Sequence, residues 1–418
     1  MDFAHDERTV DLLGRVRDFI EARVIPAEAR LDDELAASPG DWSFRPVVQE
    51  LQAEARAAGL WNLFLPGERG AGLTNLQYAP LAEATGWSPR LGPVAFNCAA
   101  PDTGNMELLA EFGTPAQQAE WLDPLLDARI RSAFCMTEPD VASSDATNIA
   151  TRIERDGDHY VVTGRKWWST GAMNPDATLL IVMGKTEPDA PRHRQQSMII
   201  VPRGTPGVSI VRPLTVFGYD DRDHGGHAEV VFDAARVPAS NLIGGEGDGF
   251  AIAQARLGPG RIHHCMRAIG MAERALSLAA ARANGRVAFG RPLAEQGVVR
   301  QWIADSRIRI EALRLLVLKT AWLMDTVGNR RAMTEIQAIK IAVPQAVQEI
   351  VDRAIQLFGA AGLSSDTPLA ELYAGARALR LADGPDEVHL DALGKAELRR
   401  AAASPAAALP TPGAPVPA

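Results

Sequence analysis

The sequence predicts an α+β fold, mainly α, in which a small antiparallel β domain lies between two helical domains. Three observations predict this order. Apolar residues recur at helical spacing over about the first 130 residues, short β-branched runs follow, and long apolar stripes at helical spacing fill most of the remainder. Because 418 residues exceed what one core usually organises, we expect two or three domains, or lobes that share one core.

The predicted boundaries follow these changes of pattern. We place an N-terminal helical domain at residues 1–130, a middle β domain at 131–245, a C-terminal helical bundle at 246–400 and a disordered Pro/Ala-rich tail at 401–418. The tail ends in SPAAALPTPGAPVPA, a composition that gives little apolar surface to bury.

Each domain has its own signature. The first has an apolar helical pattern that is clearest at Val10, Leu13, Val16, Phe19 and Ile20. The second contains the runs HYVVTG, TLLIVMG, SMIIVP, VSIVRP and AEVVF, which turns separate. The third has a stripe of Ile262, Met266, Ile269, Ala272 and Leu276. A later helix is expected from about Thr334 through Leu357, with a kink at Pro344.

Charge and cysteine content exclude several classes of function. The net charge of −9 and the dispersed basic residues argue against nucleic-acid binding. Cys98, Cys135 and Cys265 are an odd number without metal-ligand spacing, so we expect reduced thiols and no metal site. The start, MDFAHDERTVDLLG, lacks a basic segment followed by an apolar one, and no apolar run is long enough to span a bilayer. A cytoplasmic location is expected.

Two segments carry the first candidate site. AFCMTEPDVASSDATN, from Ala133 to Asn148, offers hydroxyls and backbone amides that suit a polar ring edge or a phosphate, although an ordinary capped interdomain turn has the same composition. GRKWWSTG, from Gly164 to Gly171, follows after a strand. Together they resemble the two signature flavin segments of the acyl-CoA dehydrogenase family, and the predicted domain order is that of its fold.

The resemblance implies FAD as cofactor. It implies that Thr137, Trp168 and Thr170 lie against the isoalloxazine ring, and that the neighbouring flavin contacts are Phe134, Met136, Ser143 and Ser169. It places Ser144 at the CoA side of the site. The chain has one residue more than the common pattern between Pro139 and Ser144, so Ser143 and Ser144 both remain candidates for the CoA-side serine.

Three further segments extend the resemblance. In RLGPGRIHH, which we expect to open the first long C-terminal helix, Arg261 has the place of the arginine that holds the CoA portion. An arginine at a helix start is otherwise a solvated charge, and His263 and His264 are expected on the helix surface without a role. RVAFGRPLAEQ and QLFGAAG resemble the segments that reach the FAD of a neighbouring subunit, which implies cofactor contacts for Arg286, Gln296, Gln356 and Gly359.

The last segment, RLADGPDEVH, contains the candidate base. Most of the family has Glu-Gly-Thr where this chain has Asp383, Gly384 and Pro385, and the phrase resembles the branch of family members ten and eleven. The resemblance makes Asp383 the catalytic base, Gly384 a substrate contact, and Pro385 and Glu387 cofactor contacts. Asp386 and Glu387 are rival bases, and an Asp that caps the last helix is the structural alternative.

The implied reaction is the FAD-dependent α,β-dehydrogenation of an acyl-CoA to the trans-2-enoyl-CoA, as in fatty-acid β-oxidation, by a homodimer or homotetramer that passes electrons to an electron-transfer flavoprotein. We expect a dry site to raise the pKa of the base. Two alternatives remain: an oxygen-using relative, either an acyl-CoA oxidase or a nitroalkane-oxidase-like enzyme, and a non-catalytic scaffold of the same fold. The resemblance extends from about residue 6 to about residue 400.

Overall fold

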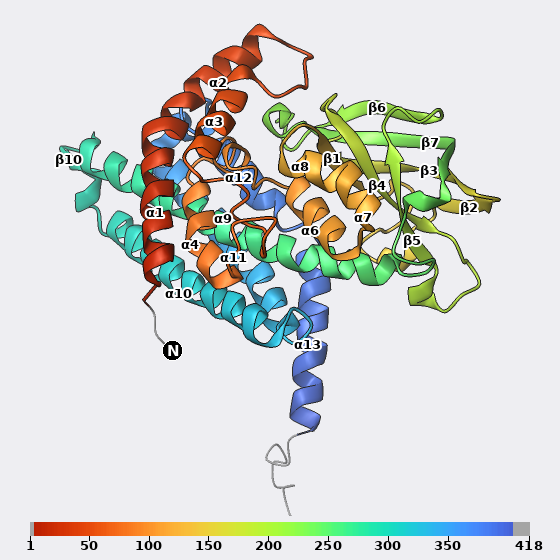
Figure 1. Cartoon of the computed structure of the whole chain (residues 1–418). Coiled ribbons are helices and arrows are strands. Elements are labelled where there is room, and N and C mark those ends of the chain that lie inside the picture. The colour runs from red at the N-terminus through yellow and green to blue at the C-terminus, as the bar shows by residue number, and fades with distance from the viewer. Residues whose placement is uncertain (1–3, 404–418) are drawn as a thin grey trace, which may run out of the picture.

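The computed structural model describes residues 4–403 and has the predicted order of a helical, a β and a second helical part. Figure 1 shows the β sheet at one end of the molecule and a small hairpin of β9 (Val287–Ala288) and β10 (Arg291–Pro292) at the opposite end. The last helix, α13 (Asp386–Ala402), projects away from the body (Figure 1). It includes the start of the predicted tail, of which residues 404–418 lie outside the described range.

The N-terminal part is helical, as predicted. Its longer helices are α1 (Glu7–Phe19), α2 (Ile25–Ala37), α3 (Pro46–Ala57), α4 (Asn75–Thr85) and α6 (Asp102–Phe112). Short helices α5 (Gly92–Ala95), α7 (Pro115–Gln117) and α8 (Asp123–Leu126) complete this part. Local capping fixes where several helices begin. At α4, Thr74 and Gln77 form a capping box, which satisfies two backbone N–H groups.

The middle part is an eight-stranded sheet whose hydrogen-bonded order is β6-β7-β3-β2-β4-β5-β8, with β1 paired to β4. The strands are β1 (Arg131–Cys135), β2 (Arg152–Asp156), β3 (His159–Thr170), β4 (Ala177–Lys185), β5 (Gln196–Pro202), β6 (Val208–Leu214), β7 (His227–Pro238) and β8 (Leu242–Ile243). The prediction of an antiparallel domain holds for most pairs, but β4 pairs in parallel with both β1 and β2. A parallel pair needs a long connection, and residues 136–176 supply it.

Alternate residues of the central strand β4 face two different cores. Leu179, Ile181 and Met183 join a core shared with both helical parts, whereas Leu180 and Val182 join a core on the other face of the sheet. This alternation is the period of two that a strand imposes. The shared core makes the helical parts and one face of the sheet a single packed body.

The C-terminal part consists of long helices: α9 (Gly249–Gly285), α10 (Gly297–Val327), α11 (Met333–Phe358), α12 (Leu369–Ala378) and α13. Contrary to the prediction, RLGPGRIHH lies inside α9 instead of opening it, because α9 continues through Pro259. Packing of the preceding turns against the sheet supports this part of the helix: the backbone of Gly249 lies against Ser197 of β5. Helix α11 likewise continues through Pro344.

The structure also describes the cysteines and the apolar helices that the sequence contains. All three cysteines lie in the described range, where they are buried and unpaired. Between residues 4 and 403, no helix is both long and apolar enough to cross a membrane.

A close helix crossing holds the N-terminal part to the C-terminal bundle. A methyl group added at Gly270 of α9 would lie 2.0 Å from the carbonyl oxygen of Glu83 and 2.9 Å from the Cα of Gly86, at the end of α4. Backbone atoms cannot move aside as a flexible side chain can, so only glycine permits this separation of the helices.

We therefore expect Gly270→Ala to lower the free energy of unfolding by about 1–3 kcal/mol, since the overlap forces α4 and α9 apart. Chemical denaturation followed by circular dichroism measures the change. Gly285→Ala is the matched control on the same helix, because a methyl group there meets no atom within 4 Å. Equal stability of the two variants would show that the crossing is not tight.

Candidate active site

A buried ion pair joins the two predicted cofactor segments. Lys166 of β3 is fully buried, and its Nζ lies 2.8 Å from Oε1 of Glu138, which follows β1. The same ammonium group donates to the carbonyl oxygens of Met136 at 2.9 Å and Met183 at 2.6 Å. Next to this pair, the backbone N–H of Trp167 donates to the carbonyl of Thr137 at 3.0 Å. The segments at 133–138 and 164–170 are therefore held side by side.

The Glu138 carboxylate is kept in its charged form. Burial would raise its pKa, but the Lys166 ammonium and the backbone N–H groups of Ala150 and Thr151 lower it. A charged acceptor with three donors makes a fixed cross-link.

The second segment presents an exposed aromatic ring on strained backbone. The pairing of β3 with β7 shifts register between Lys166 and Ser169, and within this bulge Trp168 has a φ of 51°. Its side chain is 40% exposed, while the flanking Ser169 is buried. Strain of this kind persists at functional sites, and an exposed indole next to Thr170 fits the face of a planar cofactor ring.

His227 contacts two of the three predicted flavin residues of this segment, Trp168 and Thr170. Its ring centroid lies 5.3 Å from that of Trp168, and its Nδ1 lies 2.9 Å from Oγ1 of Thr170. On its other side, Nε2 lies 2.7 Å from Oδ2 of Asp221. Sequence reasoning missed His227 and Asp221, because only the pairing of β3 with β7 brings them to Thr170.

The two serines of the first segment differ in their contacts. The Ser143 hydroxyl accepts from the backbone N–H of Glu138 at 2.9 Å, so it stabilises its own loop. Ser144 is exposed and makes no hydrogen bond within residues 4–403. Of the two, Ser144 is therefore the one whose hydroxyl is available to a bound molecule. Phe134, also in this segment, lies under the Arg256 guanidinium at 4.0 Å.

Asp383 lies in the loop between α12 and α13, at a φ of 55°. Its side chain is 18% exposed, and Oδ2 is 3.6 Å from Nε2 of His264 on α9. Arg261, one turn earlier on α9, donates through Nε to the carbonyl of Asp383 at 3.1 Å, and Lys340 of α11 reaches the Gly384 carbonyl at 3.5 Å. Two buried cations thus hold the backbone of the candidate base and of the residue after it.

These charges make the candidate base more acidic than the sequence analysis expected. Burial acts to raise the pKa of Asp383, but His264, Arg256, Arg261 and Lys340 together lower it below the usual value. Burial and Arg267 lower the pKa of His264 to about 4, so the arginines and the lysine are the cations that act on Asp383 at neutral pH. Asp383 is therefore ionised at neutral pH, in the form that can accept a proton.

The rival acids are placed differently. Asp386 is buried, and its Oδ2 accepts from Nε of Arg380 at 2.7 Å and from Nε2 of Gln345 at 3.0 Å, so it ties α13 to its surroundings. Glu387 is exposed in the first turn of α13. Gly384 has a φ of 106°, and a Cβ there would lie 2.9 Å from Nε2 of His389, so this position requires glycine. Pro385 precedes α13 as its N-cap.

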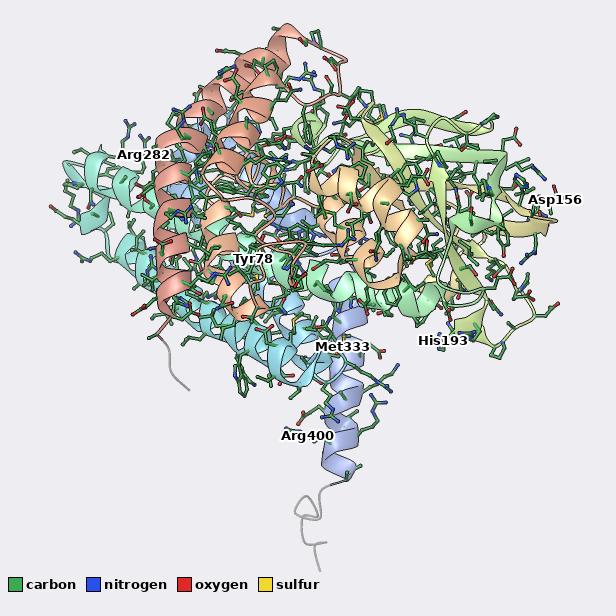
Figure 2. All side chains as sticks on the ribbon, viewed as in Figure 1. Tyr78, Asp156, His193, Arg282, Met333 and Arg400 are labelled. Atoms are coloured by element: carbon green, nitrogen blue, oxygen red, sulfur yellow. The ribbon has the colours of Figure 1, made fainter. Side chains whose placement is uncertain are left out.

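The expectation that the two histidines lie on the helix surface is wrong. His263 is buried between the rings of Phe64 and Tyr78, at centroid distances of 6.2 and 5.1 Å. Tyr78, labelled in Figure 2, lies inside the helical body. His264 faces Asp383. Because the motif lies within α9 instead of at its exposed start, its side chains point into packed surroundings; this also buries Arg261.

The remaining predicted cofactor residues gather at the far end of the molecule. Arg286 ends α9, Gln296 precedes α10, and Gln356 and Gly359 end α11. The Arg282 guanidinium lies 5.2 Å from the Phe358 ring, which joins the ends of α9 and α11. Figure 2 labels Arg282 at this end and Asp156 at the opposite end, in the sheet. The structure therefore separates this group from Trp168 and Asp383.

Comparisons with known proteins agree with this architecture. The N-terminal, middle and C-terminal domains of acyl-CoA dehydrogenases match residues 6–129, 133–235 and 247–398. Probable acyl-CoA dehydrogenase FadE2 of Mycobacterium tuberculosis is 58% identical over 98% of this chain and 100% of its own length. A solved structure from Mycobacterium abscessus, of a protein assigned to the acyl-CoA dehydrogenases, has a TM-score of 0.92 and 52% identity, over 95% of this chain and all of that one.

A longer relative is matched only in part. Acyl-CoA dehydrogenase family member 11 of Mus musculus is 55% identical over 95% of this chain, but the match covers 51% of the mouse protein. The chain therefore spans about half the length of that relative.

The buried ion pair yields a stability prediction. Lys166→Met should lower the free energy of unfolding by about 3–5 kcal/mol, because it leaves the Glu138 carboxylate buried without its cation. The midpoint of thermal unfolding measures the loss. Lys319→Met is the matched control: that lysine is 49% exposed and lies 3.5 Å from Glu335, a geometry worth about 1 kcal/mol or less. A Lys166→Met midpoint equal to the control would mean that Glu138 is satisfied without Lys166.

Proposed function

The chain belongs to the acyl-CoA dehydrogenase family, and on that premise we propose that it catalyses the α,β-dehydrogenation of an acyl-CoA thioester to the trans-2-enoyl-CoA. The observation that carries this proposal is the position of Asp383, an ionised carboxylate on left-handed backbone, beside the buried Arg261. The fold of the family binds FAD, and its members are oxidoreductases.

The residues of the two predicted flavin segments fit the flavin. Trp168 offers an exposed aromatic face on strained backbone, and Thr137 is held beside it by the hydrogen bond from Trp167. We assign contacts with the isoalloxazine ring to Trp168, Thr137 and Thr170. When bound, FAD supplies the acceptor for the hydride that leaves the β-carbon.

Asp383 performs the proton transfer. Its carboxylate takes a proton from the α-carbon as the hydride leaves the β-carbon, and the carbon–carbon double bond forms between them. The backbone N–H of Asp383 donates to no acceptor within residues 4–403, so it is available to the thioester oxygen, where negative charge develops. Arg261 fixes this backbone through the Asp383 carbonyl.

We assign contacts with the CoA portion to Ser144 and Arg261. Ser144 is exposed, and its hydroxyl is available. Among residues 4–403, Arg261 donates only through Nε, which leaves its other N–H groups for an anionic or carbonyl oxygen. We propose an electron-transfer flavoprotein as the acceptor of the electrons. Oxygen is the competing acceptor, and the reoxidation rate of the reduced enzyme in air distinguishes the two.

We also propose that the enzyme is a homodimer or homotetramer. Arg286, Gln296, Gln356 and Gly359 lie at the opposite end from the β domain (Figure 1), so their cofactor contacts require a second subunit. The outer face of α10 supports this, because Ile308, Leu315 and Trp322 recur every seven residues and are 66%, 48% and 41% exposed. Such a stripe on one helix face suits packing against another helix.

The central test replaces the proposed base. Asp383→Asn keeps the shape of the side chain but cannot accept the proton, so the rate of anaerobic flavin reduction by substrate should fall by about two to four orders of magnitude. FAD content and binding of the enoyl-CoA product should persist. Stopped-flow absorbance with acyl-CoAs of different length and branching measures the rate and identifies the preferred substrate.

Glu387→Gln is the matched control, since it removes the exposed rival acid four residues later. It should reduce its flavin at nearly the wild-type rate. If Asp383→Asn is fast and Glu387→Gln is slow, the wrong acid has been named. If both are fast, the proposed mechanism is wrong.

The oligomer is tested at the far end of α9. Arg286→Ala should weaken FAD binding about 10- to 100-fold, because a charge-assisted hydrogen bond contributes about 1.5–3 kcal/mol, and it should weaken subunit association as well. FAD titration of the apoprotein and light scattering over a range of concentrations measure both. Arg17→Ala, an exposed arginine on α1, is the control. A wild-type monomer with a full complement of FAD would contradict the proposal.

A further inference from the structure

Thr170 is the end of a three-residue chain of hydrogen bonds. The antiparallel register pairs Thr170 of β3 with His227 of β7, and Oγ1 lies 2.9 Å from Nδ1 of the imidazole. The opposite ring nitrogen, Nε2, lies 2.7 Å from Oδ2 of Asp221. We propose that Asp221 and His227 are positioning residues that fix the direction of the Thr170 hydroxyl and so set the reduction potential of the bound flavin. This inference rests on the proposed function, which places Thr170 against the flavin ring.

With a neutral imidazole, the chemistry of the three groups fixes the direction of each bond. An ionised carboxylate only accepts hydrogen bonds, so Nε2 of His227 carries the hydrogen that Asp221 accepts. In the neutral ring, Nδ1 is then an acceptor, and the Thr170 hydroxyl donates to it. The hydrogen of that hydroxyl is committed to His227, and Thr170 presents lone pairs to any other neighbour.

The loop that carries Asp221 is built to hold this geometry. Asp221 has a φ of 51°, and its carbonyl accepts from the backbone N–H groups of His224 and Gly226, both at 2.9 Å. The Gly226 carbonyl in turn accepts at 2.8 Å from the N–H of Gly171, the residue after Thr170. The loop is therefore tied directly to the strand end that it serves.

The imidazole is held on a second side by an aromatic contact. The Trp168 ring lies 5.3 Å from that of His227, at an interplanar angle of 55°. With Asp221, Thr170 and Trp168 around it, the ring of His227 has one favoured orientation. The side chain is 16% exposed, so water competes little for its nitrogens.

The consequence concerns the oxidation state that the site prefers. Ring nitrogens of a flavin gain hydrogen on reduction, so an oxygen that offers only lone pairs favours the reduced form, and a hydroxyl free to donate favours the oxidised form. Committing the Thr170 hydrogen to His227 therefore raises the reduction potential of the bound cofactor. Without His227, the same hydroxyl is free to donate, and the potential falls.

The test measures the midpoint potential of bound FAD by equilibration with a reference dye, which needs no acyl-CoA. His227→Phe keeps an aromatic ring against Trp168 and removes both nitrogens, so the potential should become more negative. In a Thr170→Val background the same substitution should cause no further shift, because the hydroxyl through which it acts is absent. An equal shift in both backgrounds would overturn the proposal, since it would not act through Thr170.

Two further variants distinguish the positioning role from a general disturbance of the β domain. His193→Phe, an exposed histidine of the β domain labelled in Figure 2, is the matched control and should leave the potential unchanged. Asn tolerates left-handed backbone, and Asp221→Asn removes the charge and replaces one acceptor oxygen with an NH2 group. It should therefore shift the potential in the same direction as His227→Phe, but by less. An unchanged potential in Asp221→Asn would overturn the role of Asp221.

A measurement on the wild-type protein tests the proposal even where the variants lose FAD. Nitrogen-15 histidine shifts of the wild-type protein should show His227 with its hydrogen on Nε2 only; a hydrogen on Nδ1, alone or together with one on Nε2, would overturn the proposal. The hydrogen-bond chain from Asp221 to Thr170 and the assignment as an acyl-CoA dehydrogenase can also fail separately. If acyl-CoA reduces the flavin but His227→Phe leaves the potential unchanged, the proposed role of the hydrogen-bond chain is wrong and the enzyme assignment stands. If the potential shifts but no acyl-CoA reduces the flavin, the enzyme assignment fails and the proposed role of the hydrogen-bond chain stands.

Discussion

The ion pair between Lys166 and Glu138 is the contact on which the site depends. The two segments that it joins belong to strands that do not follow each other in the sheet, and β1 pairs only with β4. Without a cross-link, the loop after β1 would be free to move relative to β3. By binding the Met136 and Met183 carbonyls as well, the ammonium group fixes β1, β3 and β4 around one buried charge. Thr137 and Trp168 owe their proximity to this arrangement.

A second set of buried side chains surrounds the proposed base, Asp383. Arg256, Arg261 and His264 come from α9, Lys340 comes from α11, and the acid that they surround is in the loop before α13. Arg261 and Lys340 bond to the backbone beside the carboxylate, and thus orient the loop while their charge favours the ionised form. Arg256 also covers Phe134 and bonds to Asn105 at 3.0 Å, which connects this centre to the cofactor segment and to α6.

The candidate site residues fall into two groups that lie in different parts of the molecule. Trp168, Thr170 and Asp383 belong to one packed body, because the helical parts and one face of the sheet share a core. Arg286 and Gln356 lie at the other end of that body, where α9 and α11 end. A long helical bundle can carry a binding residue far from the site of its own chain, and a symmetric assembly then returns the residue to the site of a neighbour.

The sequence alone determined the order of the domains, the family, and which side chains could serve as base or cofactor contacts. Periodicity of apolar residues depends on local backbone geometry, and motifs are contiguous, so both can be read without a fold. Tertiary structure decided which of these groups meet. His264 faces Asp383 only because α9 continues through Pro259, and His227 reaches Thr170 only because β7 pairs with β3 in one register. Neither contact leaves a local signal, since the partners are 119 and 57 residues apart in the chain and the geometry that joins them comes from packing and strand pairing.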